Sequence, residues 1–111
     1  MNWIPLRSID DLEQVIYLSQ EKPQVIFKHS TRCNISSVAK NRLERADAPG
    51  ELQFHYLDLI SYRPLSNAVA DRFAVEHESP QILVIKNGKC VYNESHMGIN
   101  MDEIKDQLQL N

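Results

Sequence analysis

The stretch VIFKHSTRCNIS, residues 25–36, runs from an apolar segment through a polar turn to a cysteine and a second patterned segment. Residues 25–27 predict a short strand that is covered on both faces, and the spacing after Cys33 predicts a helix. The thiol of Cys33 therefore falls at the turn where the helix begins. A helix N-terminus presents free N–H groups and a partial positive charge, and both favour the thiolate, the nucleophilic form of cysteine.

Helices and strands alternate on both sides of this stretch. Four helices are expected: one capped by Ser8 and stopped by Pro23, one with Ile35, Val38, Ala39 and Leu43 as its apolar stripe, one with Pro64 at its first position, and one opened by the capping pair Asn100 and Glu103. Strands are expected at residues 25–27, 53–59, 82–85 and 90–93, with Asn87-Gly88 as a two-residue hairpin turn.

This order of elements predicts an α/β fold of the thioredoxin type. A parallel βαβ unit is followed by a β-hairpin and a terminal helix, which gives a central mixed sheet flanked by helices. The redox thiol of that fold lies at the end of the first core strand, on the N-terminus of the next helix. Cys33 occupies this position.

Length and composition limit the function classes. A chain of 111 residues, 42% apolar and 24% charged, predicts a single domain over residues 1–111, and we expect a monomer. The net charge of −3 disfavours nucleic acid as a partner. No apolar run approaches the roughly 18 to 20 residues of a membrane helix, and the first residues do not resemble a signal peptide. We therefore expect no membrane partner and a cytoplasmic location, where thiols stay reduced.

Several motifs resemble those of one family. The residues KHST (28–31), Cys33, Ile35 and Ser36, together with HESPQ (77–81), KNGK (86–89) and Ser95-His96, are similar to the monothiol bacilliredoxins. These are thioredoxin-like proteins of the bacillithiol system. The resemblance implies reduction of mixed disulfides between bacillithiol and protein cysteines. It implies S-thiolated client proteins as partners, a low-molecular-weight thiol as co-substrate and no tightly bound cofactor or metal.

The chain departs from the family pattern beside the thiol. Arg32 precedes Cys33, and Asn34 stands where the family usually has proline. Because proline at the first helical position helps to start a helix, Asn34 is expected to loosen this turn. We expect an effect on rate or stability rather than on the chemistry.

The predicted catalytic residues are Cys33 and Ser36. Ser36 stands where a two-thiol oxidoreductase has its second sulfur, so it cannot resolve a mixed disulfide, but it lies one helical turn from Cys33 and can donate a hydrogen bond to the thiolate. The mechanism is then monothiol: Cys33 takes a small thiol from a client, and a second small thiol releases it. No buried acid precedes the motif, and His29 is a weaker candidate for a general base.

The predicted substrate-binding residues surround the thiol. They are Thr31, Arg32, Asn34, Ser79, Pro80 and His96. In thioredoxin-like proteins the proline at this place is cis, and the backbone before it pairs with a substrate peptide. Among the basic residues Lys28, Arg32, Lys40 and Arg42, Arg32 is the preferred contact for a carboxylate-bearing thiol because it adjoins the sulfur. His96 either contacts substrate or is a solvated loop histidine.

The second cysteine, Cys90, is expected to be structural. The hairpin carries it to the far end of the sheet, on the order of 20 Å from Cys33, whereas a disulfide needs Cα atoms within about 7 Å. Two other functions stay open at this point: an iron–sulfur carrier of the monothiol-glutaredoxin type, and a thioredoxin-like binding module whose cysteine is not catalytic.

Overall fold

Strand β2 (Gln24–His29) lies at the centre of the sheet, and all six of its residues are buried. The computed structural model describes residues 1–110. In it, β2 pairs in parallel with β3 (Gln53–Asp58) and antiparallel with β4 (Gln81–Lys86). The edge strands β1 (Trp3–Pro5) and β5 (Lys89–Ser95) complete the order β1-β3-β2-β4-β5. The predicted α/β fold with a mixed sheet and a C-terminal hairpin is confirmed.

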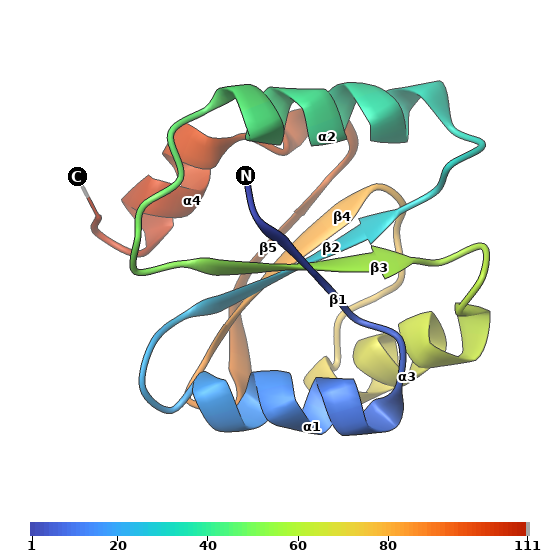
Figure 1. Cartoon of the computed structure of the whole chain (residues 1–111), viewed down its shortest axis with the longest axis horizontal. Helices are drawn as coiled ribbons and strands as arrows, with labels where there is room; N and C mark the ends of the chain where they lie inside the picture. The colour runs from blue at the N-terminus through green and yellow to red at the C-terminus, as the bar shows by residue number, and fades with distance from the viewer. Residues whose placement is uncertain (111) are drawn as a thin grey trace.

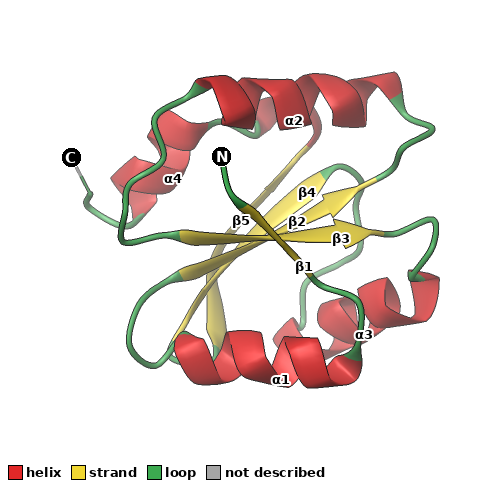
Figure 2. Ribbon diagram, in the orientation of Figure 1, coloured by secondary structure: helices red, strands yellow, loops and turns green. Residues whose placement is uncertain are grey.

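Helices cover both faces of this sheet (Figures 1 and 2). Helices α1 (Ile9–Leu18) and α3 (Arg63–Phe73) lie on one face, and α2 (Asn34–Arg45) and α4 (Met101–Gln107) lie on the other. A strand covered on both sides can be apolar at successive positions, which explains the unbroken apolar run in β2. No helix within residues 1–110 is long and apolar enough to cross a membrane.

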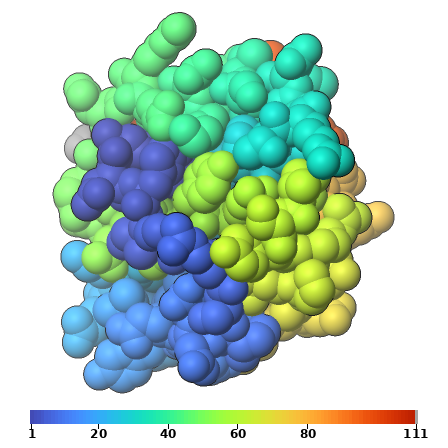
Figure 3. All heavy atoms as spheres, turned by 45° about the vertical axis from the view of Figure 1, so that its right-hand side comes forward, coloured from blue at the N-terminus to red at the C-terminus, as the bar shows by residue number. Residues whose placement is uncertain are grey.

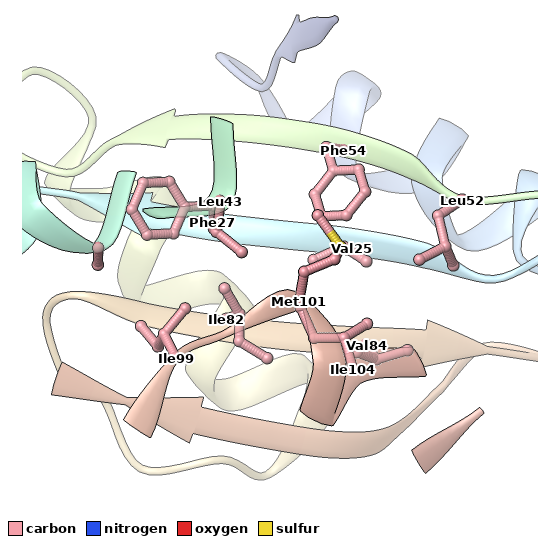
Figure 4. Close-up of a cluster of buried hydrophobic side chains, with 11 residues drawn as sticks. Val25, Phe27, Leu43, Leu52, Phe54, Ile82, Val84, Ile99, Met101 and Ile104 are labelled. Carbon is pink, nitrogen blue, oxygen red and sulfur yellow. The ribbon is translucent and has the colours of Figure 1, made fainter. Parts of the chain in front are cut away.

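The alternation along the strands divides the core into two layers. Val25 and Phe27 of β2 pack with Leu43 of α2 and Ile104 of α4 (Figure 4). On the opposite face Ile26 belongs to the cluster formed with α1 and α3. Consecutive residues of β2 therefore reach different helix layers, which matters for the site at the end of this strand.

Local rules hold at three element boundaries. The Ser8 side chain accepts a hydrogen bond from the Asp11 N–H at the start of α1, and the Asn100 side chain accepts one from the Glu103 N–H at the start of α4. Asn87 and Gly88 both have positive φ, 52° and 76°, as a two-residue hairpin turn between right-twisted strands requires. These predictions are confirmed.

Four features differ from the predictions. Strand β1 and a short 3₁₀-helix, η1 (His96–Gly98), were not expected. Helix α3 begins at Arg63, so Pro64 is its second residue rather than its first. The apolar stripe predicted for α2 is correct at Ala39 and Leu43, which are buried, and wrong at Ile35 and Val38, which are 44% and 46% exposed. Ser36 is buried in their place. The Ser36 hydroxyl hydrogen-bonds to the His29 ring and to the Ser30 N–H, which explains why this polar side chain faces the interior.

Candidate active site

Cys33 is the N-cap residue of α2, directly after the turn that leaves β2. Its N–H donates to the Ser30 carbonyl at 3.2 Å, and its own carbonyl accepts from the Ser37 N–H at 3.1 Å. The side chain is partly exposed and unpaired by any disulfide. The predicted position of the thiol, on the first turn of a helix after the central strand, is thus the observed one. In Figure 3 the atoms around the start of α2 reach the surface beside the segment that follows β3.

Ser36 holds the turn instead of contacting solvent. Its hydroxyl is fully buried, accepts a hydrogen bond from the Ser30 N–H at 3.0 Å and lies 2.6 Å from Nδ1 of His29. Ser30 thus connects Ser36 to Cys33, because its carbonyl accepts from the Cys33 N–H. The expected hydrogen bond from Ser36 to the thiolate is not among the contacts within residues 1–110. The hydroxyl proton is available to Nδ1 of His29.

His29, at the end of β2, is the buried partner of Ser36. It is 5% exposed, and its ring packs against Phe27 and Tyr56 with centroids 5.7 and 5.5 Å away. Burial lowers its pKa, and the charge of Lys40 lowers it further, against smaller opposing effects of Asp58 and Glu44. A neutral imidazole accepts the Ser36 proton at Nδ1. The spacing of seven residues between His29 and Ser36, across a turn, gave no signal for this contact.

The segment before β4, residues 76–80, lies beside the end of β2, because Gln81 is the register partner of Lys28; we call it the rim segment. The Ser79–Pro80 peptide bond is cis, as expected. The Pro80 carbonyl accepts from the His96 N–H at 3.0 Å, so η1 adjoins this segment. The His96 ring lies 3.5 Å from the Glu78 carboxylate, and both side chains are about half exposed. The Ser79 hydroxyl is buried without a hydrogen-bond partner in the described part of the chain.

The basic residues near Cys33 differ sharply in accessibility. Lys40 forms an ion pair with Glu44 at 2.9 Å, and Arg42 donates to the carbonyls of Met97 and Ile99 at 2.9 and 3.2 Å. Lys28 is fully buried, so of the four basic residues considered it is not available to a thiol in solution. Arg32 is exposed and has no ion pair or hydrogen bond within residues 1–110. Thr31 and Asn34 are exposed beside it.

Lys28 instead contacts the segment on the rim. Its ammonium donates to the Ser66 carbonyl at 3.1 Å and to Nδ1 of His77 at 3.3 Å. Burial, and to a lesser extent the charge of Arg63, lowers its pKa to about 8. Lys28 belongs to the KHST motif and His77 to the HESPQ motif, but their separation of 49 residues in the sequence gave no indication that they are in contact.

A protein-family model described as the monothiol bacilliredoxin BrxC matches residues 4–104. The chain belongs to the monothiol bacilliredoxin family. The match spans Cys33, Ser36, the cis proline and His96, and it confirms the resemblance seen in the KHST and HESPQ motifs.

Solved structures agree with this membership. A thioredoxin-fold structure, proposed to be an oxidoreductase, is 34% identical, with 96% of this chain and 93% of that chain covered and a TM-score of 0.81. The thioredoxins of Malassezia sympodialis and Fasciola hepatica are 16% and 20% identical, with TM-scores of 0.75 and 0.72. Their alignments cover 97% and 96% of this chain and 89% and 96% of theirs, and they show the fold alone. Family and fold together support a thiol oxidoreductase.

Cys90 takes no part in the site of this bacilliredoxin. It pairs with Ile85, which in turn pairs with Gln24 at the first position of β2, whereas Cys33 follows the last position. Burial raises the pKa of Cys90, so its thiol is held protonated. The two cysteines lie toward opposite ends of the sheet, as expected, and neither forms a disulfide.

Proposed function

We propose that this bacilliredoxin removes a low-molecular-weight thiol, bacillithiol being the first candidate, from mixed disulfides with protein cysteines. The observation that carries the proposal is the arrangement around Cys33. One partly exposed thiol sits on a helix N-terminus, a buried hydroxyl occupies the place of a second thiol, and Cys90 lies at the other end of the sheet. Such a site supports attack but not intramolecular resolution.

The reaction proceeds in two exchanges. The Cys33 thiolate attacks the small-thiol sulfur of the mixed disulfide; the bond between that sulfur and the client breaks, and the client cysteine leaves as a thiolate that takes up a proton. Cys33 now carries the small thiol. A second small thiol, as its thiolate, attacks that adduct, which forms the small-thiol disulfide and returns Cys33 as a thiolate. Each exchange conserves the number of disulfide bonds.

The surrounding residues have distinct proposed roles. Arg32, with Thr31 and Asn34 beside it, faces solvent next to the sulfur and attracts the carboxylates of the small thiol. The Ser79 backbone before Pro80 pairs with the client segment, and His96 borders the same rim. Ser36 and His29 hold the turn on which Cys33 sits.

Intact-mass measurement tests this function. A client peptide carrying bacillithiol in a mixed disulfide is incubated with the protein and the peptide mass is followed. We expect the peptide to lose the adduct and Cys33 to gain it, Cys33→Ser to abolish the transfer and Cys90→Ser to leave it unchanged. Transfer that persists in Cys33→Ser would contradict the proposal. Visible absorbance of the purified protein would point to an iron–sulfur carrier instead.

A further inference from the structure

The two halves of the family motif meet inside the protein. Lys28 comes from the KHST segment on β2, and His77 comes from the HESPQ segment between α3 and β4. The Lys28 ammonium lies 3.3 Å from Nδ1 of His77 and 3.1 Å from the Ser66 carbonyl of α3, and the Ser66 hydroxyl is 3.3 Å from the same ring nitrogen. One buried side chain therefore joins the central strand, a helix and the rim segment.

Stability alone gives no reason for this lysine. Lys28 is 0% exposed, and its hydrogen-bond partners are neutral groups, with no ion pair to a carboxylate within residues 1–110. Taking an ammonium out of water is expensive, and an apolar side chain of similar size is often as stable or more stable at such a position. We therefore look for the role of Lys28 in how it positions the segments that it connects, α3 and the residues around His77.

That geometry concerns the segment before the cis proline. Gln81, 1% exposed, donates to the Glu76 carbonyl at 2.9 Å and accepts from the Glu78 N–H at 3.4 Å. Lys28 and Gln81 are register partners on β2 and β4. The sheet thus holds residues 76–78 from two adjacent strands, directly before Ser79 and Pro80.

We propose that Lys28 and His77 are positioning residues for the exchange reaction, which hold the Ser79 backbone where a client segment pairs with it. This inference rests on the proposed function of Cys33. Lys28 and His77 should affect the binding of a client and should leave the intrinsic reactivity of the Cys33 thiol unchanged.

The contact requires a neutral His77, because Nδ1 accepts the hydrogen bond. Lys28 on β2 and Arg63 on α3 face His77 with positive charge, and Glu78 on its own segment faces it with negative charge. Burial and the two cations lower the pKa of His77. Protonation at acid pH converts Nδ1 into a donor and places a second positive charge beside Lys28. Client binding should therefore weaken as the pH falls through the pKa of His77.

Two substitutions that remove the contact test the proposal. Lys28→Met keeps the length of the side chain without its charge, and His77→Leu removes the acceptor. For an S-thiolated client peptide we expect KM to rise about five- to tenfold in each variant. The double variant should be no worse than either single one, because both remove the same contact. The rate of Cys33 alkylation by iodoacetamide and the urea midpoint of Lys28→Met should not fall.

A conservative variant separates positioning from general packing. His77→Asn places an amide oxygen near the position of Nδ1 and cannot be protonated in this pH range. It should keep KM close to that of the wild type at pH 7.5 and remove the rise of KM at acid pH. As a matched control, His55→Leu deletes a buried hydrogen bond to Gln24, 2.7 Å long, at the opposite end of β2, and should leave KM unchanged.

The outcomes distinguish this inference from the proposed function. Unchanged KM in His77→Leu and Lys28→Met, with an active wild type, would overturn the positioning role alone. An equal rise of KM in His55→Leu, or alkylation slowed in proportion to KM, would show that the variants act through general destabilisation and would also overturn it. A wild-type protein that removes no small thiol would instead defeat the proposed function, and this inference with it.

Discussion

The hydroxyl of Ser36 lies 2.6 Å from Nδ1 of His29 and accepts the Ser30 N–H, so the first turn of α2 is fastened to the end of β2. Sequence reasoning placed this hydroxyl beside the thiolate because serine replaces a second cysteine. In the structure it serves the turn that presents Cys33, and His29 supplies the partner inside the protein.

Ser36→Ala should destabilise the fold by about 1–3 kcal/mol, because it leaves the Ser30 N–H and the His29 ring nitrogen without their partner. Urea denaturation measures the change. Ser37→Ala is the matched control, since Ser37 is exposed on the same turn. A free energy of unfolding that stays at the wild-type value in Ser36→Ala would show that the hydrogen bonds of Ser36 do not stabilise the turn.

Asn34→Pro should raise the free energy of unfolding by about 0.4–1 kcal/mol. Asn34 is the first residue of α2, a position that proline favours. Cys33 has φ −115° and ψ 119°, close to the conformation that a residue before proline adopts. The substitution therefore fits without a change of backbone, and thermal or urea unfolding measures the gain. A loss of stability would mean that the Asn34 side chain or N–H holds the turn.

Arg32→Gln should slow the reaction of Cys33 with a carboxylate-bearing disulfide such as glutathione disulfide by about two- to threefold at low salt. The reason is the loss of an exposed positive charge beside the sulfur. The same variant should react normally with the uncharged disulfide of 2-mercaptoethanol. If both disulfides slow equally, Arg32 affects the turn rather than the approach of the anion.

The stability of the wild type should fall as the pH drops from about 6.5 to about 4. Burial lowers the pKa of His55 from 6.5 to about 4, so in this range the unfolded chain binds more protons than the folded one. The shifted pKa of His55 alone should lower the free energy of unfolding at pH 4.5 by on the order of 2 to 3 kcal/mol. The pKa values of His29 and His77 are lowered as well and act in the same direction. Urea unfolding measures the free energy of unfolding at pH 7 and pH 4.5, and the difference between the two values should be smaller in His55→Leu than in the wild type. A difference equal to that of the wild type would contradict the assignment of this pH dependence to His55.

Local rules explain which parts of this fold could be predicted. The caps at Ser8 and Asn100, the Asn87-Gly88 turn and the position of Cys33 depend on residues close together in the chain, and each was predicted correctly. The unpredicted strand β1 has only three residues, one of them Pro5, and it exists through its parallel pairing with β3. Such pairing leaves little trace in a short edge segment.

The site was harder to predict because its contacts join distant residues. Periodicity correctly placed Ala39 and Leu43 on the buried face of α2, but it could not show that Ser36, through its contact with His29, is buried while Ile35 and Val38 are exposed. From the sequence, Lys28 was grouped with the other basic residues near Cys33, and nothing local indicated that it is buried. Only the packing of α3 and the rim segment over that face of β2 shows that it is enclosed.

Lys28 and His29 are consecutive on β2 and point to opposite faces of the sheet, one toward the segment before Pro80 and the other toward the turn of Cys33. The last two residues of a single strand therefore fix the separation between the turn of Cys33 and the segment before Pro80. Because side chains alternate along a strand, one residue inserted between the pair would send both to the same face. A substitution at either position removes the contacts of one side chain, whereas a change in their spacing would redirect a whole side chain to the wrong face of the sheet.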